Sequence, residues 1–177
     1  ARIQSKREEI NNIVRLSPIV VANLAAKNPS VMAIGMVGLE DEEFLVYDRQ
    51  DLYRVLHNSI DDPSRVANEE LLIDGVAFPR YQTTVFLTTG NGVTEIISGQ
   101  PTSMKTEDPA GWIAGKDAEA YLRYLYMLSP ENNQIYKYER LSNRYGAPDG
   151  YNINGDIENA LDMAIDGNIF VLKEEGE

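Results

Sequence analysis

Hydrophobic residues along the chain fall into short runs of three to five, separated by clusters of glycine, asparagine, aspartate and proline. The clearest runs lie at residues 44–47, 85–87, 124–128 and 169–172. They are rich in β-branched and aromatic residues and have the length of strands. Turn dipeptides such as Asn-Gly and Asp-Gly lie between them. This pattern predicts an all-β protein.

The runs recur at a nearly constant spacing. One anchor residue in each run, namely Leu45, Phe86, Tyr126 and Phe170, gives spacings of 41, 40 and 44 positions. A repeat of about 40–50 residues is the length of one four-stranded propeller blade. Each run is preceded by another apolar run, and three are followed by a third. The preceding runs are at residues 31–37, 71–78, 111–114 and 160–165, and the third runs at 52–55, 93–96 and 135–138.

The sequence therefore predicts a partial β-propeller of about four blades, the last of them incomplete. A third strand in the fourth blade would centre near position 178, one beyond Glu177. We expect a fragment of a larger propeller, or a sheet that another segment or chain completes. The alternative is a mixed α+β domain in which residues 107–123 and 157–163 form helices on an antiparallel sheet.

A leading segment, residues 1–20, precedes the predicted blades at 21–177. Ser5 and Glu8 have the spacing of a capping box, and Pro18 cannot continue a helix. These residues predict a short amphipathic helix over 5–16, and a further helical turn is expected at 22–26. Residues 1–15 carry a net charge of +2 and the other 162 residues carry −14. The sequence shows neither a signal-peptide pattern nor a run of about 18 apolar residues, so we expect no membrane insertion by this segment.

Residues 160–172, ALDMAIDGNIFVL, resemble the core of an NHL-type propeller blade, in which an apolar strand, a glycine turn and a second apolar strand follow one another. Residues 126–138 are similar to the next half of such a blade. Residues 44–55 match more loosely, and 85–96 match least, with Thr89 where aspartate is common. The resemblance covers about residues 29–177, within which residues 107–123 form an insertion relative to such blades. It implies an interaction platform, although a minority of these propellers are hydrolases, lyases or ligand sensors.

The net charge of −12 narrows the classes of partner. An acidic chain repels nucleic-acid backbones and anionic lipid surfaces, so neither is expected to bind. The chain has no cysteine and one histidine, His57. This composition removes disulfides and thiolate metal sites, and it argues against zinc and against a Ser-His-Asp triad. The composition does not assign the protein to a cellular compartment.

Calcium is bound by oxygen ligands alone, so it is the one metal ion that this composition leaves to consider. Candidate carboxylates lie near the predicted turns of the first and last blades, although no Asp-x-Asp-x-Asp-Gly loop is present. The candidates are Asp48, Asp51, Asp162 and Asp166. We otherwise expect no cofactor, and solvated acidic loops are the alternative explanation of these residues.

Aromatic residues near the third predicted blade supply a candidate binding surface. Trp112 is the single tryptophan, and Tyr121 and Tyr124 follow it among ten tyrosines. Exposed tryptophan and tyrosine suit protein or glycan recognition. Alternatively, these rings fill the space between blades.

The first functional hypothesis is a non-enzymatic scaffold that binds a protein or glycan through blade loops. The alternative is a calcium-assisted hydrolase or lyase at the propeller channel, where the predicted innermost strands would bring Asp74, Asp117 and Asp162 together. A third hypothesis is a structural segment of a larger surface or secreted assembly. The absence of a compact catalytic set favours the scaffold.

Overall fold

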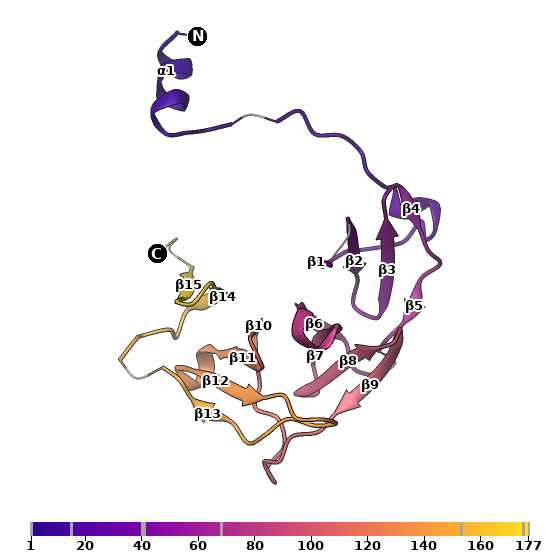
Figure 1. Ribbon diagram of the computed structural model, residues 1–177, viewed down its shortest axis with the longest axis vertical. Coiled ribbons are helices and arrows are strands. Elements are labelled where there is room, and N and C mark those ends of the chain that lie inside the picture. Colours follow the sequence, from indigo (N-terminus) through magenta and orange to yellow (C-terminus); the bar gives the residue numbers. More distant parts are fainter. Residues whose placement is uncertain are drawn as a thin grey trace.

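The computed structural model describes residues 2–14, 16–39, 42–67, 69–152, 154–174 and 176. Within this part the strands form four antiparallel sheets that follow one another around an open arc (Figure 1). We call the sheets blades 1 to 4 in chain order. Hairpin turns join successive strands, and each blade uses a continuous stretch of chain.

Blades 1 and 2 contain nine strands. Blade 1 runs β1 (Gly35–Gly38), β2 (Glu43–Tyr47), β3 (Asp51–Leu56), with β4 (Ser59–Ile60) and β5 (Ser64–Arg65) both pairing with β3. Blade 2 runs β6 (Leu72–Phe78), β7 (Thr83–Thr88), β8 (Gly92–Ile97) and β9 (Gln100–Met104). A 3-10 turn, η2 (Pro79–Tyr81), links β6 to β7.

Blades 3 and 4 follow in the same order. Blade 3 runs β10 (Asp117–Tyr121), β11 (Tyr124–Ser129), β12 (Gln134–Glu139) and β13 (Asp149–Gly150), with the 3-10 turn η3 (Pro130–Asn132) before β12. Blade 4 is the hairpin β14 (Ala160–Ile165) and β15 (Ile169–Lys173).

The first strand of each blade lies on the inner side of the arc. β1 packs beside β6, β6 beside β10, and β10 beside β14. Sheets stacked around a common centre with their first strands innermost are the arrangement of a β-propeller. The described part of the chain is therefore an all-β partial propeller of four blades, the last with two strands, behind a short N-terminal helix.

Apolar layers between neighbouring blades form the core. Tyr47 of blade 1 and Phe86 of blade 2 meet edge to face, with ring centroids 5.2 Å apart. Glycine in the innermost strands makes room for these rings. A Cβ on Gly75 would lie 2.4 Å from the Phe86 ring, and one on Gly35 would lie 2.3 Å from Cζ of Tyr47. Both positions exclude a side chain because of this close approach.

The predicted second and third runs are confirmed as strands, and Leu45, Phe86, Tyr126 and Phe170 all lie in the second strand of their blade. The prediction for the innermost strand of blade 3 is wrong. Residues 111–114 form a loop, and β10 lies at Asp117–Tyr121, inside the stretch that we expected to be an insertion. The α+β alternative is also wrong, because the stretches 107–123 and 157–163 contain strands β10 and β14 and no helix.

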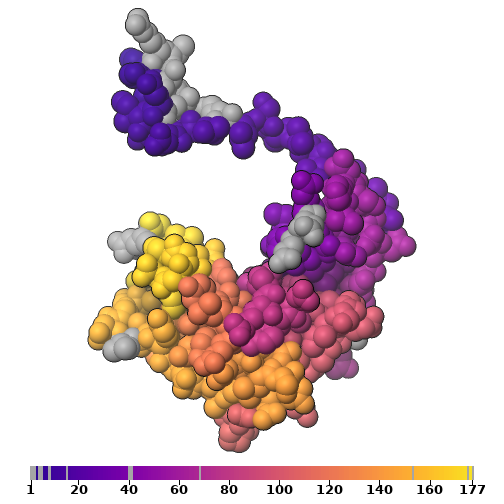
Figure 2. Space-filling model, viewed as in Figure 1, coloured from indigo at the N-terminus to yellow at the C-terminus, as the bar shows by residue number. Residues whose placement is uncertain are grey.

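Helix α1 spans Arg2–Ile10, so it begins and ends earlier than predicted. Ser5 lies within it rather than at its N-cap, and Asn12, with a positive φ of 51°, follows its end well before Pro18. The expected turn at 22–26 is confirmed as the 3-10 turn η1 (Leu24–Ala26), capped by Asn23. The described helices lack the length and apolar character needed to cross a membrane. The segment before η1 extends away from the blades (Figures 1 and 2).

Candidate functional site

A groove of about 790 Å³ lies between blades 1 and 2. Its walls come from β2 and β3 on one side and from β6, the start of β7 and β8 on the other. The stretch that carries β4 and β5 and the turn between β8 and β9 form its rim. We refer to this feature as the interblade groove.

Apolar side chains form the floor of the interblade groove. Leu45 and Leu52 project from blade 1 and are buried, and Ala77 and Ile96 of blade 2 are half-buried. Strand alternation sets this arrangement, because every second side chain of β2 faces blade 2. A concave apolar floor of this kind is the usual basis of ligand binding.

Charged side chains surround the floor. Arg54 forms a bidentate ion pair with Glu43, with N–O distances of 2.5 and 2.7 Å, and lies 3.9 Å from Asp61. The hydrogen bonds from Arg54 lower the pKa of Glu43. Arg65 also lines the groove, where Asp61 and Asp62 add to Glu43. Three carboxylates against two guanidinium groups give the lining a net charge of −1, which favours a neutral or basic ligand.

Thr83 supplies an unpaired polar atom at this site. It lines the groove at the start of β7 and is 8% exposed. Its buried hydroxyl makes no hydrogen bond to any described residue. A buried polar group without a partner costs about 1–3 kcal/mol, so such groups are rare in folded proteins. This hydroxyl is therefore an unsatisfied polar group in the wall of the groove, and a ligand reaches it only when the wall moves locally.

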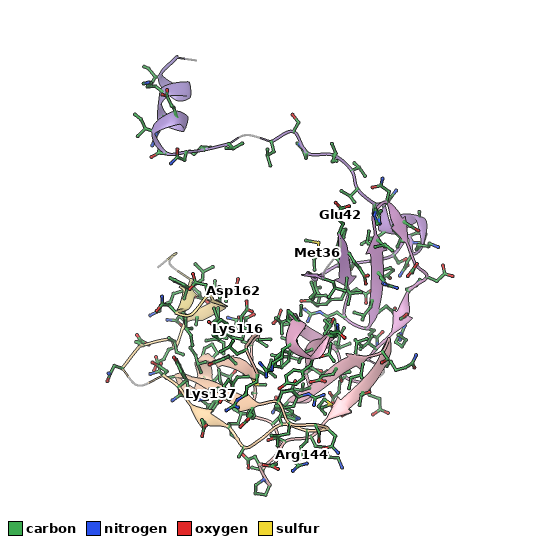
Figure 3. All side chains as sticks on the ribbon, viewed as in Figure 1. Met36, Glu42, Lys116, Lys137, Arg144 and Asp162 are labelled. Carbon is green, nitrogen blue, oxygen red and sulfur yellow. The ribbon has the colours of Figure 1, made fainter. Side chains whose placement is uncertain are left out.

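A second polar cluster faces the inner side of the arc, where blades 2, 3 and 4 meet. The backbone amide of Ala118 donates to Oδ2 of Asp74 at 2.9 Å, and the Tyr47 hydroxyl donates to Oδ1 at 3.3 Å. Asp117 lies against Asp74, and the negative charge of Asp162 in β14 contributes to raising the pKa of Asp117. Asp74 and Asp117, both expected at the channel, are thus in contact, and Asp162 lies near enough for its charge to act on Asp117. Figure 3 shows Asp162 on this inner side, with Lys116 on the neighbouring blade.

Burial and neighbouring charge perturb the acids of this channel cluster. Burial, followed by the charge of Asp74, raises the pKa of Asp117 to about 8. The same causes raise the pKa of Glu119. Oδ2 of Asp117 is buried and accepts no hydrogen bond from a described residue. Asp117 therefore holds a proton at neutral pH, which it can share with Asp74.

The predicted aromatic surface is divided between two interblade layers. Trp112 is half-buried, its ring packs on Tyr138 and Tyr145, and its Nε1–H donates to the Met104 carbonyl at 2.9 Å. Tyr121 and Tyr124 are cross-strand neighbours in blade 3 and pack against the layer facing blade 4. The structure brings these two tyrosines together, with Trp112 in a different layer.

The predicted calcium ligands lie at opposite ends of the arc. Asp48 and Asp51 are in blade 1, where Asp48 accepts the amides of residues 50 and 51 and Asp51 pairs with Arg65. Asp162 and Asp166 are in blade 4. Among the described residues, no three or more carboxylates or histidines are grouped as metal ligands would be.

Sequence reasoning missed the interblade groove, because its residues come from segments that show no shared motif. Thr83 is one of several threonines in apolar surroundings, and its missing hydrogen bond follows from packing alone. The single His57 lies in an exposed turn with a positive φ of 54°, 4.0 Å from Glu42.

No protein-family model matches the sequence, and no curated protein matches it. Among solved structures, the N-terminal domain of Nup159 is similar, with a TM-score of 0.49 and 12% identity over 76% of this chain and 36% of that chain. A chain from the S. cerevisiae structure of Dbp5 bound to Nup159, Gle1, IP6 and ADP has a TM-score of 0.48 and 12% identity over 75% and 36%.

The dihydro-heme d1 dehydrogenase NirN, in complex with DHE, is a third similar structure. Its TM-score is 0.49 and its identity 12%, over 81% of this chain and 36% of that chain. The present chain thus spans about a third of the length of these proteins. At this level of identity the likeness concerns the fold alone, and the function is argued from the residues of this chain.

Proposed function

We propose that this chain is a protein-binding β-propeller module and that its binding site is the interblade groove. One observation carries the proposal: an apolar groove of about 790 Å³ that contains the buried, unpartnered hydroxyl of Thr83. The floor suits one or two aliphatic side chains. The hydroxyl suits a backbone amide or carbonyl of an extended segment, because extended peptides present both groups at regular intervals.

The charges of the site favour a basic segment. The groove lining has a net charge of −1, and the whole chain has −12. Lysine or arginine residues beside the buried aliphatic side chains would meet Asp61 at the rim, where Asp62 already pairs with Lys27 at 2.8 Å. A glycan is less suitable, because the floor is aliphatic and the single tryptophan is packed in another layer.

The test uses two sets of synthetic peptides of about eight residues. Both sets carry two central aliphatic residues, which are flanked by lysines in one set and by glutamates in the other. We expect calorimetry to show binding of lysine-flanked peptides only, with affinity falling as salt rises. If no peptide of either set binds, or if both sets bind equally, the proposed site is wrong.

Two variants test whether the peptide binds in the interblade groove. Thr83→Val keeps the volume but removes the hydroxyl, so peptide affinity should fall several-fold while thermal stability stays equal or rises. Ala77→Phe fills the floor and should weaken binding by about tenfold or more, which corresponds to about 1.4 kcal/mol. Leu122→Phe, which enlarges a side chain on an exposed turn of blade 3, is the matched control. Unchanged affinity in both groove variants would contradict the assignment.

A second candidate function is proton transfer at the channel cluster. The observation that favours it is the contact of two carboxyl groups, Asp74 and Asp117, one of them protonated at neutral pH. Two carboxyl groups in contact that share one proton act as acid and base in peptide hydrolysis. Release of nitroaniline from a panel of peptide nitroanilides should then fall at least 100-fold in Asp117→Asn. Equal release by both proteins would remove this candidate.

A further inference from the structure

The charged side chains that line the interblade groove all come from blade 1. They lie on β2, on β3 and on the stretch that carries β4 and β5, whereas the wall from blade 2 consists of uncharged residues. A ligand in the groove therefore meets charge on one side only. The charged lining residues are Glu43, Arg54, Asp61, Asp62 and Arg65.

Most of these charges are neutralised by a close partner within the chain. Each pair joins one carboxylate to one guanidinium or ammonium group at less than 3 Å, so neither member carries an uncompensated charge toward a ligand. The pairs are Glu43–Arg54, Asp51–Arg65 and Asp62–Lys27, with N–O distances of 2.5, 2.6 and 2.8 Å.

The uncompensated charge of the groove is at Asp61. Its Oδ2 lies 3.9 Å from Nη1 of Arg54, whose Nε and Nη2 already donate to Glu43, and its side chain is 61% exposed. The amide of Asp61 donates to the Arg54 carbonyl at 3.0 Å and holds the backbone of residue 61 against β3. The net charge of −1 is therefore located at one fixed point of the lining.

Strand register relates this point to the aliphatic floor. Leu45 lies directly opposite Arg54, and opposite residues of an antiparallel pair share a face. Leu52 precedes Arg54 by two residues, so it shares that face as well. The amide bond to Arg54 places Asp61 level with that residue. Asp61 is therefore displaced from Leu52, along the strand direction, by one two-residue step of roughly 6.6–6.8 Å.

An extended peptide repeats the same step. Its side chains at positions i and i+2 point to one side and are separated by the same roughly 6.6–6.8 Å, while the side chain at i+1 points to the other side. A peptide that places an aliphatic side chain on the floor at Leu52 can therefore place the side chain two residues away at Asp61.

From this spacing we infer that Asp61 determines the specificity of the interblade groove, by binding a lysine or arginine two residues away from the aliphatic side chain on the floor. The inference rests on the proposed function and narrows its ligand to extended segments with this alternation. A basic residue directly beside the aliphatic one points toward the uncharged wall of blade 2 and gains little from the groove.

Two isomeric peptides of about eight residues test the spacing. Both contain one valine, two lysines and otherwise alanine and serine. The lysines lie two residues before and after the valine in the first isomer and directly beside it in the second, so the direction of binding does not matter. We expect calorimetry on the whole chain to show roughly three- to fivefold tighter binding of the first isomer, with a difference that shrinks as salt rises.

Variants test whether Asp61 causes this preference. Asp61→Asn should abolish it, and Asp61→Lys should favour the first arrangement when glutamates replace the lysines. The matched control is Asp149→Asn, which removes the charge of one exposed aspartate in blade 3 and should leave the preference unchanged.

Equal affinity of the two isomers for the parent, or a preference that Asp61→Asn leaves in place, would overturn the inference. The proposed function still holds in that case if lysine-flanked peptides bind and Ala77→Phe weakens their binding. If no peptide binds the parent, the proposed function and this inference are both wrong.

Discussion

The ionisation of Asp117, which lies where three blades meet, makes the stability of the fold depend on pH. Burial and the neighbouring Asp74 raise its pKa from 3.8 to about 8. Between about pH 4 and pH 8 the folded chain therefore holds a proton that the unfolded chain has released. The free energy of unfolding falls as pH rises through this window, and the full cost of ionising Asp117 is present above pH 8.

Asp117→Asn removes this ionisation and keeps a hydrogen-bond donor toward Asp74. At pH 4 the variant and the parent should have similar stability. At pH 8 the variant should be more stable by at least about 1 kcal/mol, which raises Tm by roughly 2–4 °C for a chain of this size. Thermal melts from pH 4 to pH 9 measure the difference, with Glu131→Gln as a control for the loss of one exposed negative charge. A difference that does not change with pH would contradict the assignment.

Side-chain position was predictable from sequence where the repeat fixes it. Asp74 and Asp162 lie in apolar runs whose place in the blade follows from the spacing, so their meeting near the channel could be expected. Thr83 could not be recognised from sequence as an unpaired residue, because the missing hydrogen bond of its hydroxyl depends on how neighbouring segments pack in three dimensions. Trp112 could equally have been a surface or a packing residue, and its position among Tyr138 and Tyr145 depends on the loop before β10.

At the scale of strands, a buried ion pair joins blades 2 and 3. Glu95 of β8 accepts two hydrogen bonds from Arg140, which follows β12, at 2.9 and 2.8 Å, and a third from the Tyr145 hydroxyl. Glu95 is fully buried and Arg140 is 8% exposed. The interaction spans 45 residues of sequence, so it fixes the second blade to the third rather than stabilising either hairpin alone.

Removing one partner of this pair should be more damaging than removing both. Arg140→Met leaves the Glu95 carboxylate buried without its cation, and we expect a loss of about 3–5 kcal/mol in the free energy of unfolding. In Glu95→Leu/Arg140→Met no charge stays buried, so a large part of the loss should be recovered. Urea unfolding of the parent, the two single variants and the double variant measures both effects. Additive losses would show that the pair does not act as a unit.

Strand prediction succeeded where both faces of a strand are apolar and failed at β10. In blades 2 and 3 the second and third strands lie between neighbouring blades, so their residues form recognisable apolar runs. β10 alternates Asp117, Ala118, Glu119 and Ala120, because one of its faces lines the acidic channel. The apolar run at 111–114 instead supplies Trp112, whose ring covers the layer between blades 2 and 3.

At the scale of the molecule, acidic residues are spread along the arc rather than gathered at one ion site. The carboxylates predicted to bind calcium lie in blades 1 and 4, and three of them are engaged in turns or in the ion pair with Arg65. We therefore expect Tm to differ by less than about 1 °C between excess calcium and excess chelator. A rise of several degrees with calcium would reveal an ion bound to the folded state, because specific binding stabilises by mass action.

An apolar layer recurs between successive sheets, and the first three sheets are each made from one continuous stretch of about 30–35 residues. A stretch of that length carries one face that fits the sheet before it and another that fits the sheet after it. A gene that encodes such a chain can gain or lose a whole unit without disturbing the contacts among the units that remain. Relatives of this protein should therefore differ in length by multiples of one sheet, with shorter insertions confined to the loops.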